Sequence, residues 1–114
     1  MTQSRRLLGA AGEDAAAQWY VNNGYQLLAR NWRCREGELD LVLRRGRHVI
    51  FAEVKARSSD RFGLPAEAVT RVKQQRIRAL AARFLEDAIV SAATVRFDVV
   101  SVLAGEVQVY ESAF

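Results

Sequence analysis

Alternating hydrophobic and polar residues mark two neighbouring strands near the middle of the chain. The alternation covers residues 39–43 and 48–56, and the four residues between them, Arg-Arg-Gly-Arg, are typical of a short turn. The simplest local structure is therefore a β-hairpin. One face of the second strand carries only apolar side chains, as expected of a sheet face that packs against a helix: Ile50, Ala52, Val54 and Ala56.

The other face of the second strand changes from apolar to charged along its length. Val49 and Phe51 are followed by Glu53 and Lys55, which lie roughly 6 to 7 Å apart along one strand surface. In the first strand, Asp40 interrupts a run of leucines. The alternation places those leucines together on the face opposite Asp40: Leu39, Leu41 and Leu43.

Charged groups on an otherwise buried face are costly unless they are paired or bind a metal. Asp40, Glu53 and Lys55 are therefore the first functional candidates. The pattern leaves one alternative open, a salt bridge on an exposed edge strand that contributes about 0 to 1 kcal/mol.

Further elements are expected on both sides of the hairpin. Before it, an alanine-rich helix ends at Gly24 and a strand follows; after it, Thr70 suits the N-cap of an amphipathic helix, and two strands close the chain. The expected ranges are a helix at 8–23, a strand at 25–33, the hairpin, a helix at 71–88, and strands at 95–103 and 107–110. This order predicts one α/β domain that covers residues 1–114.

The second helix has an apolar stripe that contains one charge. We expect six residues to form the stripe: Val69, Val72, Ile77, Leu80, Phe84 and Ala88. Lys73 lies within it, and we expect Lys73, together with Gln74, to reach the same polar pocket as Lys55. The alternative is that Lys73 directs its ammonium group to solvent at the helix end.

Composition narrows the classes of function. Fifteen arginines and two lysines against 13 acidic residues leave a net charge of +4, and an excess of arginine favours phosphate contacts, as in nucleic-acid binding. The single cysteine, Cys34, excludes an intramolecular disulfide, and no stretch approaches the roughly 20 apolar residues of a membrane span. We expect a cytoplasmic protein without a membrane segment. Among the remaining charges, we expect Asp98 to pair with an arginine across the sheet.

Several short motifs occur in an order that is more specific than any one of them. They are Gly12-Glu13, Asn31-x-Arg33, Gly37-Glu38-Leu39-Asp40, Phe51-Ala52-Glu53-Val54-Lys55-Ala56-Arg57, Lys73-Gln74, Phe97-Asp98-Val99-Val100 and Ala113-Phe114. In this order the chain resembles the YraN-type family of small uncharacterised bacterial proteins, which is in turn similar to archaeal Holliday-junction resolvases of the PD-(D/E)xK nuclease superfamily. The resemblance implies a single three-layer restriction-endonuclease-like domain with a central mixed β-sheet flanked by helices.

The resemblance also implies roles for individual residues. Asp40 and Glu53 would be the metal-binding carboxylates, and Lys55 the catalytic lysine of the motif. Glu13, on the first helix, would add a carboxylate, and Val54 would add its carbonyl oxygen. Hard oxygen donors of this kind suit Mg²⁺ or Mn²⁺.

These residues suit metal-dependent hydrolysis of DNA. Asp40 and Glu53 would hold one or two ions, while Lys55 orients or deprotonates the attacking water and stabilises the developing negative charge. Four arginines would position the DNA backbone without recognising bases: Arg33, Arg35, Arg57 and Arg61. Lys73 and Gln74 are further candidates for contact with nucleic acid.

Three hypotheses follow. The first is a metal-dependent endonuclease that acts on double-stranded, branched or Holliday-junction-like DNA. The second is a non-catalytic DNA-binding or DNA-processing accessory protein on the same fold. The third is an interaction domain whose apolar segment 107–114 docks a partner or a second copy in a homodimer. Salt-sensitive DNA binding separates the first two from the third, and metal-dependent cleavage separates the first from the second.

Overall fold

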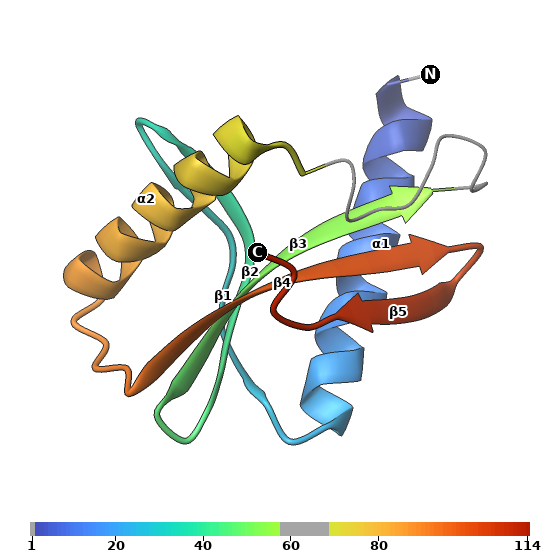
Figure 1. Cartoon of the computed structure of the whole chain (residues 1–114). Coiled ribbons are helices and arrows are strands. Elements are labelled where there is room, and N and C mark those ends of the chain that lie inside the picture. Colours follow the sequence, from blue (N-terminus) through green and yellow to red (C-terminus); the bar gives the residue numbers. More distant parts are fainter. Residues whose placement is uncertain (1, 58–68) are drawn as a thin grey trace.

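Two helices lie on opposite faces of a five-stranded sheet (Figure 1). The computed structural model describes the backbone of residues 2–57 and 69–114, and side chains from residue 8 onward. In chain order the elements are α1 (Thr2–Asn22), β1 (Gln26–Cys34), β2 (Gly37–Arg45), β3 (His48–Arg57), α2 (Arg71–Asp87), β4 (Thr94–Leu103) and β5 (Glu106–Tyr110). Strands follow one another across the sheet from β1 to β5; β3 and β4 are parallel, and the other neighbours are antiparallel. The predicted three-layer α/β fold with a mixed sheet is confirmed.

The sheet separates the core into two clusters. Val42 of β2 pairs with Phe51 of β3, and both belong to the cluster under α2. Leu41 and Ala52 form the next pair and belong to the cluster under α1. The period of two along each strand therefore distributes apolar side chains to both helices. None of the helices within the described part of the chain is long and apolar enough to span a bilayer.

The apolar stripe predicted for α2 is partly wrong. Thr70 caps the helix as expected, because its side chain accepts a hydrogen bond from the backbone N of Lys73. The buried residues of α2 are Ile77, Leu80, Ala81 and Phe84, whereas Val72 is 65% exposed. Val72 precedes Ile77 by five residues and so lies about 140° away around the helix, outside the core-facing stripe. Ala88 is exposed because it lies beyond the last turn as the C-cap.

The face predicted for Leu39 is also wrong. Leu41 and Leu43 lie on the α1 side, but Leu39 belongs to the cluster under α2. The change of face lies opposite Asn31 of the neighbouring strand β1, which has a left-handed φ of 54° and stands between Arg30, the partner of Leu41, and Trp32. Beyond this point Trp32 pairs with Leu39, and both pack on the α2 side.

The pairing of β2 with β3 stops part-way along the two strands. It runs from Arg45 and His48 at the turn to Leu41 and Ala52, while β3 stays paired with β4 as far as Arg57. In Figure 1 the far ends of β2 and β3 point in different directions. The edge of β3 that faces β2 is therefore open beyond Ala52, and side chains can occupy this space.

Candidate functional site

Two carboxyl groups meet where the β2–β3 ladder ends. Asp40 is the first residue of β2 outside the ladder, and its Oδ2 accepts a hydrogen bond of 2.9 Å from the backbone N of Val54. The carboxyl group of Glu53 lies beside that of Asp40, and the two interact. The side chain of Asp40 thus replaces the carbonyl partner that a longer β2–β3 ladder would give to Val54.

The position of Asp40 makes it difficult to ionise. Burial raises its pKa to about 7, and the negative charge of Glu53 acts in the same direction, while the hydrogen bond from Val54 opposes both. A protonated Asp40 can donate a hydrogen bond to Glu53. Asp40 therefore carries a proton in much of the population near neutral pH.

Two lysine amines complete a four-residue cluster, which we call the carboxylate–lysine cluster: Asp40, Glu53, Lys55 and Lys73. Lys73 Nζ lies 3.3 Å from Glu53 Oε1, and the side chain of Glu53 is only 8% exposed. The amine of Lys55 lies beside that of Lys73, and the two interact. The prediction that Lys73 reaches the polar pocket of Lys55 is confirmed.

The two amines differ in their affinity for a proton. Burial and the neighbouring Lys73 lower the pKa of Lys55. Burial also acts to lower the pKa of Lys73, but the hydrogen bond to Lys55 and the attraction of Glu53 outweigh it, and this pKa is raised. Lys73 therefore holds its proton more tightly than Lys55.

The other predicted ligands have different surroundings. Glu13 accepts a hydrogen bond of 3.0 Å from Asn31 and forms an ion pair of 3.4 Å with Arg30. Across residues 8–57 and 69–114, no three His, Cys, Asp or Glu side chains form a group that could hold a metal ion, so Glu13 does not join Asp40 and Glu53 in this arrangement. Gln74 donates to the carbonyl of Val69, 3.1 Å away, and that bond ties it to the start of α2.

The carbonyl of Val54 is oriented by the strand itself. In a β-strand the N–H and C=O of one residue point toward the same neighbouring strand. Because the Val54 N–H points to Asp40, its carbonyl also faces the space between β2 and β3. This orientation fits its predicted use as a ligand.

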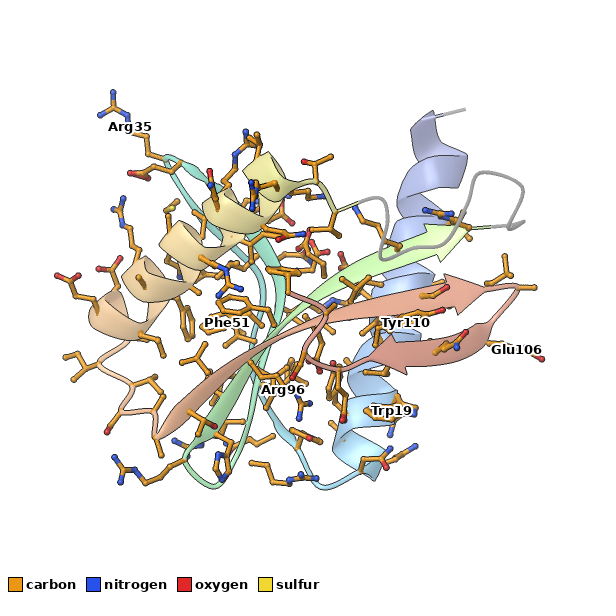
Figure 2. All side chains as sticks on the ribbon, in the orientation of Figure 1. Trp19, Arg35, Phe51, Arg96, Glu106 and Tyr110 are labelled. Atoms are coloured by element: carbon orange, nitrogen blue, oxygen red, sulfur yellow. The ribbon has the colours of Figure 1, made fainter. Side chains whose placement is uncertain are left out.

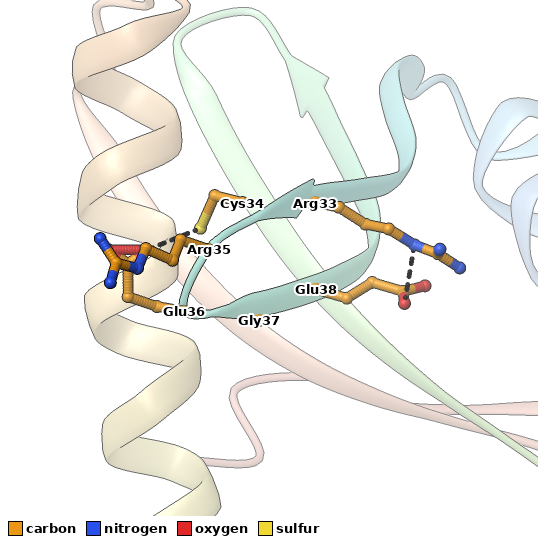
Figure 3. Close-up of a pocket in the computed structure, with 6 residues that line it drawn as sticks. All are labelled: Arg33, Cys34, Arg35, Glu36, Gly37 and Glu38. Atoms are coloured by element: carbon orange, nitrogen blue, oxygen red, sulfur yellow. Dashed lines mark hydrogen bonds and ion pairs between the residues drawn. The ribbon is translucent and has the colours of Figure 1, made fainter.

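The predicted DNA-contacting arginines are spread over two ends of the molecule. Arg33 pairs with Glu38 at 3.2 Å, and Arg35 extends into solvent at the tip of the β1–β2 hairpin (Figures 2 and 3). A shallow hollow lies at this tip (Figure 3), and its lining, residues 33–38, contains no member of the carboxylate–lysine cluster. Arg57 is half-buried at the end of β3, and Arg61 lies outside the described residues.

A second buried acid, Asp98, has a different role from the one expected. Its partner is not an arginine across the sheet but Arg96, two residues earlier on the same face of β4, with contacts of 2.8 and 2.9 Å. Tyr20 of α1 donates a further hydrogen bond of 2.6 Å to Asp98. The sequence does contain a sign of this pairing, because a separation of two residues places the side chains of Arg96 and Asp98 on the same face of a strand. This network joins α1 to the sheet.

Residues 12–102 match the uncharacterised protein family UPF0102. The chain belongs to this family. The family predicted from the motifs is thus confirmed, and the matched span contains the whole carboxylate–lysine cluster.

Relatives of the UPF0102 family align with most of the chain. A UPF0102 protein of Beutenbergia cavernae is 50% identical over 101 residues, which cover 89% of this chain and 86% of the relative. One of Frankia alni is 52% identical over 100 residues, covering 88% and 83%. One of Mycolicibacterium vanbaalenii is 48% identical over 110 residues, covering 96% and 91%.

Proposed function

We propose that this UPF0102 protein is a metal-dependent endonuclease that hydrolyses phosphodiester bonds of DNA. The observation that supports the proposal is the carboxylate–lysine cluster at the open end of the β2–β3 ladder. A structural ion pair needs one acid and one base, whereas this cluster holds two acids in contact and two amines in contact. Placing like groups together in this way destabilises the folded protein, and such destabilising arrangements are common in catalytic sites.

The cluster fits a divalent cation of the Mg²⁺ or Mn²⁺ type. Asp40, Glu53 and the carbonyl of Val54 offer hard oxygen atoms to one space, and Mg²⁺ in proteins commonly uses one or two carboxylates together with waters and substrate phosphate. An ion held there would supply Lewis-acid stabilisation of charge on the phosphoryl group. Glu13 remains a proposed additional ligand, and it would have to exchange its contacts with Arg30 and Asn31 for this role.

The amines of the cluster have complementary roles in the proposed reaction. Lys55 has a lowered pKa, so more of its neutral form is present to orient a water molecule and accept its proton. Lys73 keeps its proton and places positive charge beside the reacting phosphate. Arg33, Arg35 and Arg57 would hold the backbone on either side.

The proposed substrate class is double-stranded or branched DNA, including junctions. Two features support a relation to archaeal Holliday-junction resolvases and the PD-(D/E)xK superfamily. Asp40, Glu53 and Lys55 follow one another on consecutive strands, and the sheet that carries them lies between two helices. Double-strand processing would favour a homodimer with two sites.

One observation favours the non-catalytic alternative. Lys73 already neutralises Glu53 at 3.3 Å, so the cluster has internal counter-charges without a metal ion. A DNA-processing accessory protein could use the same basic surface without cleavage.

A cleavage assay separates these alternatives. Four-way junction, flap, linear duplex and single-stranded DNA are incubated with protein in Mg²⁺, Mn²⁺ or EDTA. Replacements Asp40→Asn, Glu53→Gln and Lys55→Ala should each lower the cleavage rate by at least about 100-fold. The matched control is Glu106→Gln, at an exposed carboxylate at the start of β5 (Figure 2).

The outcomes are distinct. Loss of cleavage in EDTA and in the three variants, with activity retained in Glu106→Gln, supports the nuclease. Cleavage that survives all three replacements comes from a contaminant and overturns it. Salt-sensitive DNA binding without cleavage by the wild type supports the accessory protein instead.

A further inference from the structure

The tip of the β2–β3 hairpin carries a second basic surface, far from Asp40 and Glu53. A hollow of about 240 Å³ lies there, room for several water molecules or one phosphate group. Two arginines and a histidine are among the residues that line it. The full lining is Tyr25, Arg45, His48, Ile50, Thr94 and Arg96. His48 is five residues before Glu53 on β3, so the hollow lies about 17 Å from the carboxylate pair.

Two guanidinium groups of this hollow are held in place by the ring of Tyr25. The Cζ atom of Arg45 lies 4.4 Å from the ring centroid, and that of Arg96 lies 5.7 Å away. Tyr25 is only 6% exposed, so the ring is a fixed support. Arg96 is further oriented by Asp98 and by a 3.2 Å hydrogen bond to the Tyr25 hydroxyl.

Arg45 has most of its donor capacity unused. Among the described residues its one hydrogen bond is long, 3.4 Å to the carbonyl of Asn23. A guanidinium group has five N–H donors in a rigid fork that matches phosphate oxygens. Stacking on Tyr25 orients this fork before any ligand binds, which lowers the entropy lost on binding.

The charges around the hollow are not balanced. The turn contributes Arg44, Arg45 and Arg47, and residues 41–52 contain no acid. Arg47 donates to the neutral hydroxyl of Ser91 at 3.1 Å. The two nearby acids, Asp98 and Glu111, are both in contact with Arg96. The surplus is therefore positive charge on the turn, which favours an anion.

We propose that this hairpin-tip site binds a phosphate group of the DNA backbone. The identity of the ligand as DNA rests on the proposed function, whereas the preference for phosphate follows from the oriented guanidinium groups and the uncompensated charge. Helices α1 and α2 cover the two faces of the sheet between this site and the carboxylate–lysine cluster. The tip therefore holds a stretch of backbone separate from the one that meets the carboxylates.

The test is DNA binding in EDTA, where no cleavage interferes. Fluorescence anisotropy with a labelled 30-base-pair duplex is measured over a range of NaCl concentrations for wild type, Arg45→Gln, Arg47→Gln and the double variant. The control with the same charge change is Arg83→Gln, because Arg83 lies on α2 and is paired with Glu36 and Asp87. Urea unfolding of each variant confirms that it is folded.

Each lost phosphate contact should make the slope of log K against log salt shallower by about 0.9, which is roughly an eightfold loss of affinity at 0.1 M salt. Because one phosphate group occupies the site, the double variant should lose this same single contact and bind roughly eightfold more weakly than wild type, while Arg83→Gln stays within about twofold.

Three results would overturn the inference. If wild type binds DNA and the double variant matches Arg83→Gln, the tip is not a contact site, and the proposed function is unaffected. If wild type binds no DNA, both proposals fail. If inorganic phosphate or a mononucleotide, titrated by calorimetry, binds the tip as tightly as the duplex does, the site takes a small anion and the assignment to DNA is wrong.

Discussion

Replacing Asp40 by asparagine should stabilise the folded protein above neutral pH. The pKa of Asp40 is about 7 in the folded chain against an ordinary value of 3.8, because burial and Glu53 both oppose ionisation. Between these values the folded state binds more protons than the unfolded state, so the free energy of unfolding falls as pH rises from about 4 to 7. Asparagine has no proton to lose, and its oxygen can still accept the hydrogen bond from Val54.

The structure sets the magnitude. A difference of about 3 between the folded and unfolded pKa corresponds to about 4 kcal/mol, which is fully lost above pH 7. This value is an upper limit, since Asp40 keeps some contact with solvent and is titrated together with its neighbours. We expect the stability of Asp40→Asn relative to wild type to increase by about 2 kcal/mol between pH 5 and pH 8.5.

Urea denaturation in EDTA at these two pH values measures the effect. Glu106→Gln, at an exposed carboxylate, is the control and should show no such increase. If Asp40→Asn changes the free energy of unfolding equally at both pH values, folding does not raise the pKa of the Asp40 carboxyl group. The claim that the candidate site lowers the stability of the folded protein is then refuted.

Three further replacements test individual contacts. Lys73→Met should lower the free energy of unfolding by about 1 to 2 kcal/mol, a value between those of exposed and buried ion pairs. When urea denaturation is repeated in a chain that already carries Glu53→Gln, the same replacement should cost much less. An equal loss in both chains would argue against the ion pair of Lys73 with Glu53. Tyr20→Phe removes a donor from the fully buried Asp98 and should cost about 1 to 3 kcal/mol in thermal unfolding, and an unchanged Tm would contradict this. Gly12→Ala would place a Cβ atom 2.5 Å from that of Ala56 and should lower the free energy of unfolding by about 1 to 3 kcal/mol. Adding Ala56→Gly to the same chain should restore part of this free energy. If urea denaturation shows no such gain, the contact with Ala56 is not the cause of the loss.

The order of elements and much of the candidate site could be predicted from local patterns. A period of two places Glu53 and Lys55 on one face of β3, and Asp40 lies on the neighbouring strand of the same hairpin. Short sequence separations were therefore enough to bring these residues together. The N-cap at Thr70 likewise depends on residues close to it in the chain.

Features that depend on distant segments were harder to predict. Leu39 changes face beside the left-handed Asn31 of the adjacent strand, and alternation within β2 carries no sign of this change. Glu13 could be assigned to the first helix, but its contact with Arg30 depends on how that helix crosses β1. Packing angles between elements decide such contacts, and they are not encoded in the periodicity of either element.

The balance of charge within the carboxylate–lysine cluster gives the strongest physical reason to expect a cation there. Ionisation of Asp40 adds a second carboxylate charge beside Glu53, and the lowered pKa of Lys55 makes this amine lose its proton more readily than an ordinary lysine. The added negative charge lies in a space that the carbonyl of Val54 also faces. Backbone pairing cannot compensate this charge, because the β2–β3 ladder has already ended at Leu41 and Ala52. A proton on Asp40 removes the charge and the proposed divalent ion would be attracted by it, so the two should compete, and the apparent metal affinity of the proposed site should rise as pH increases through 7.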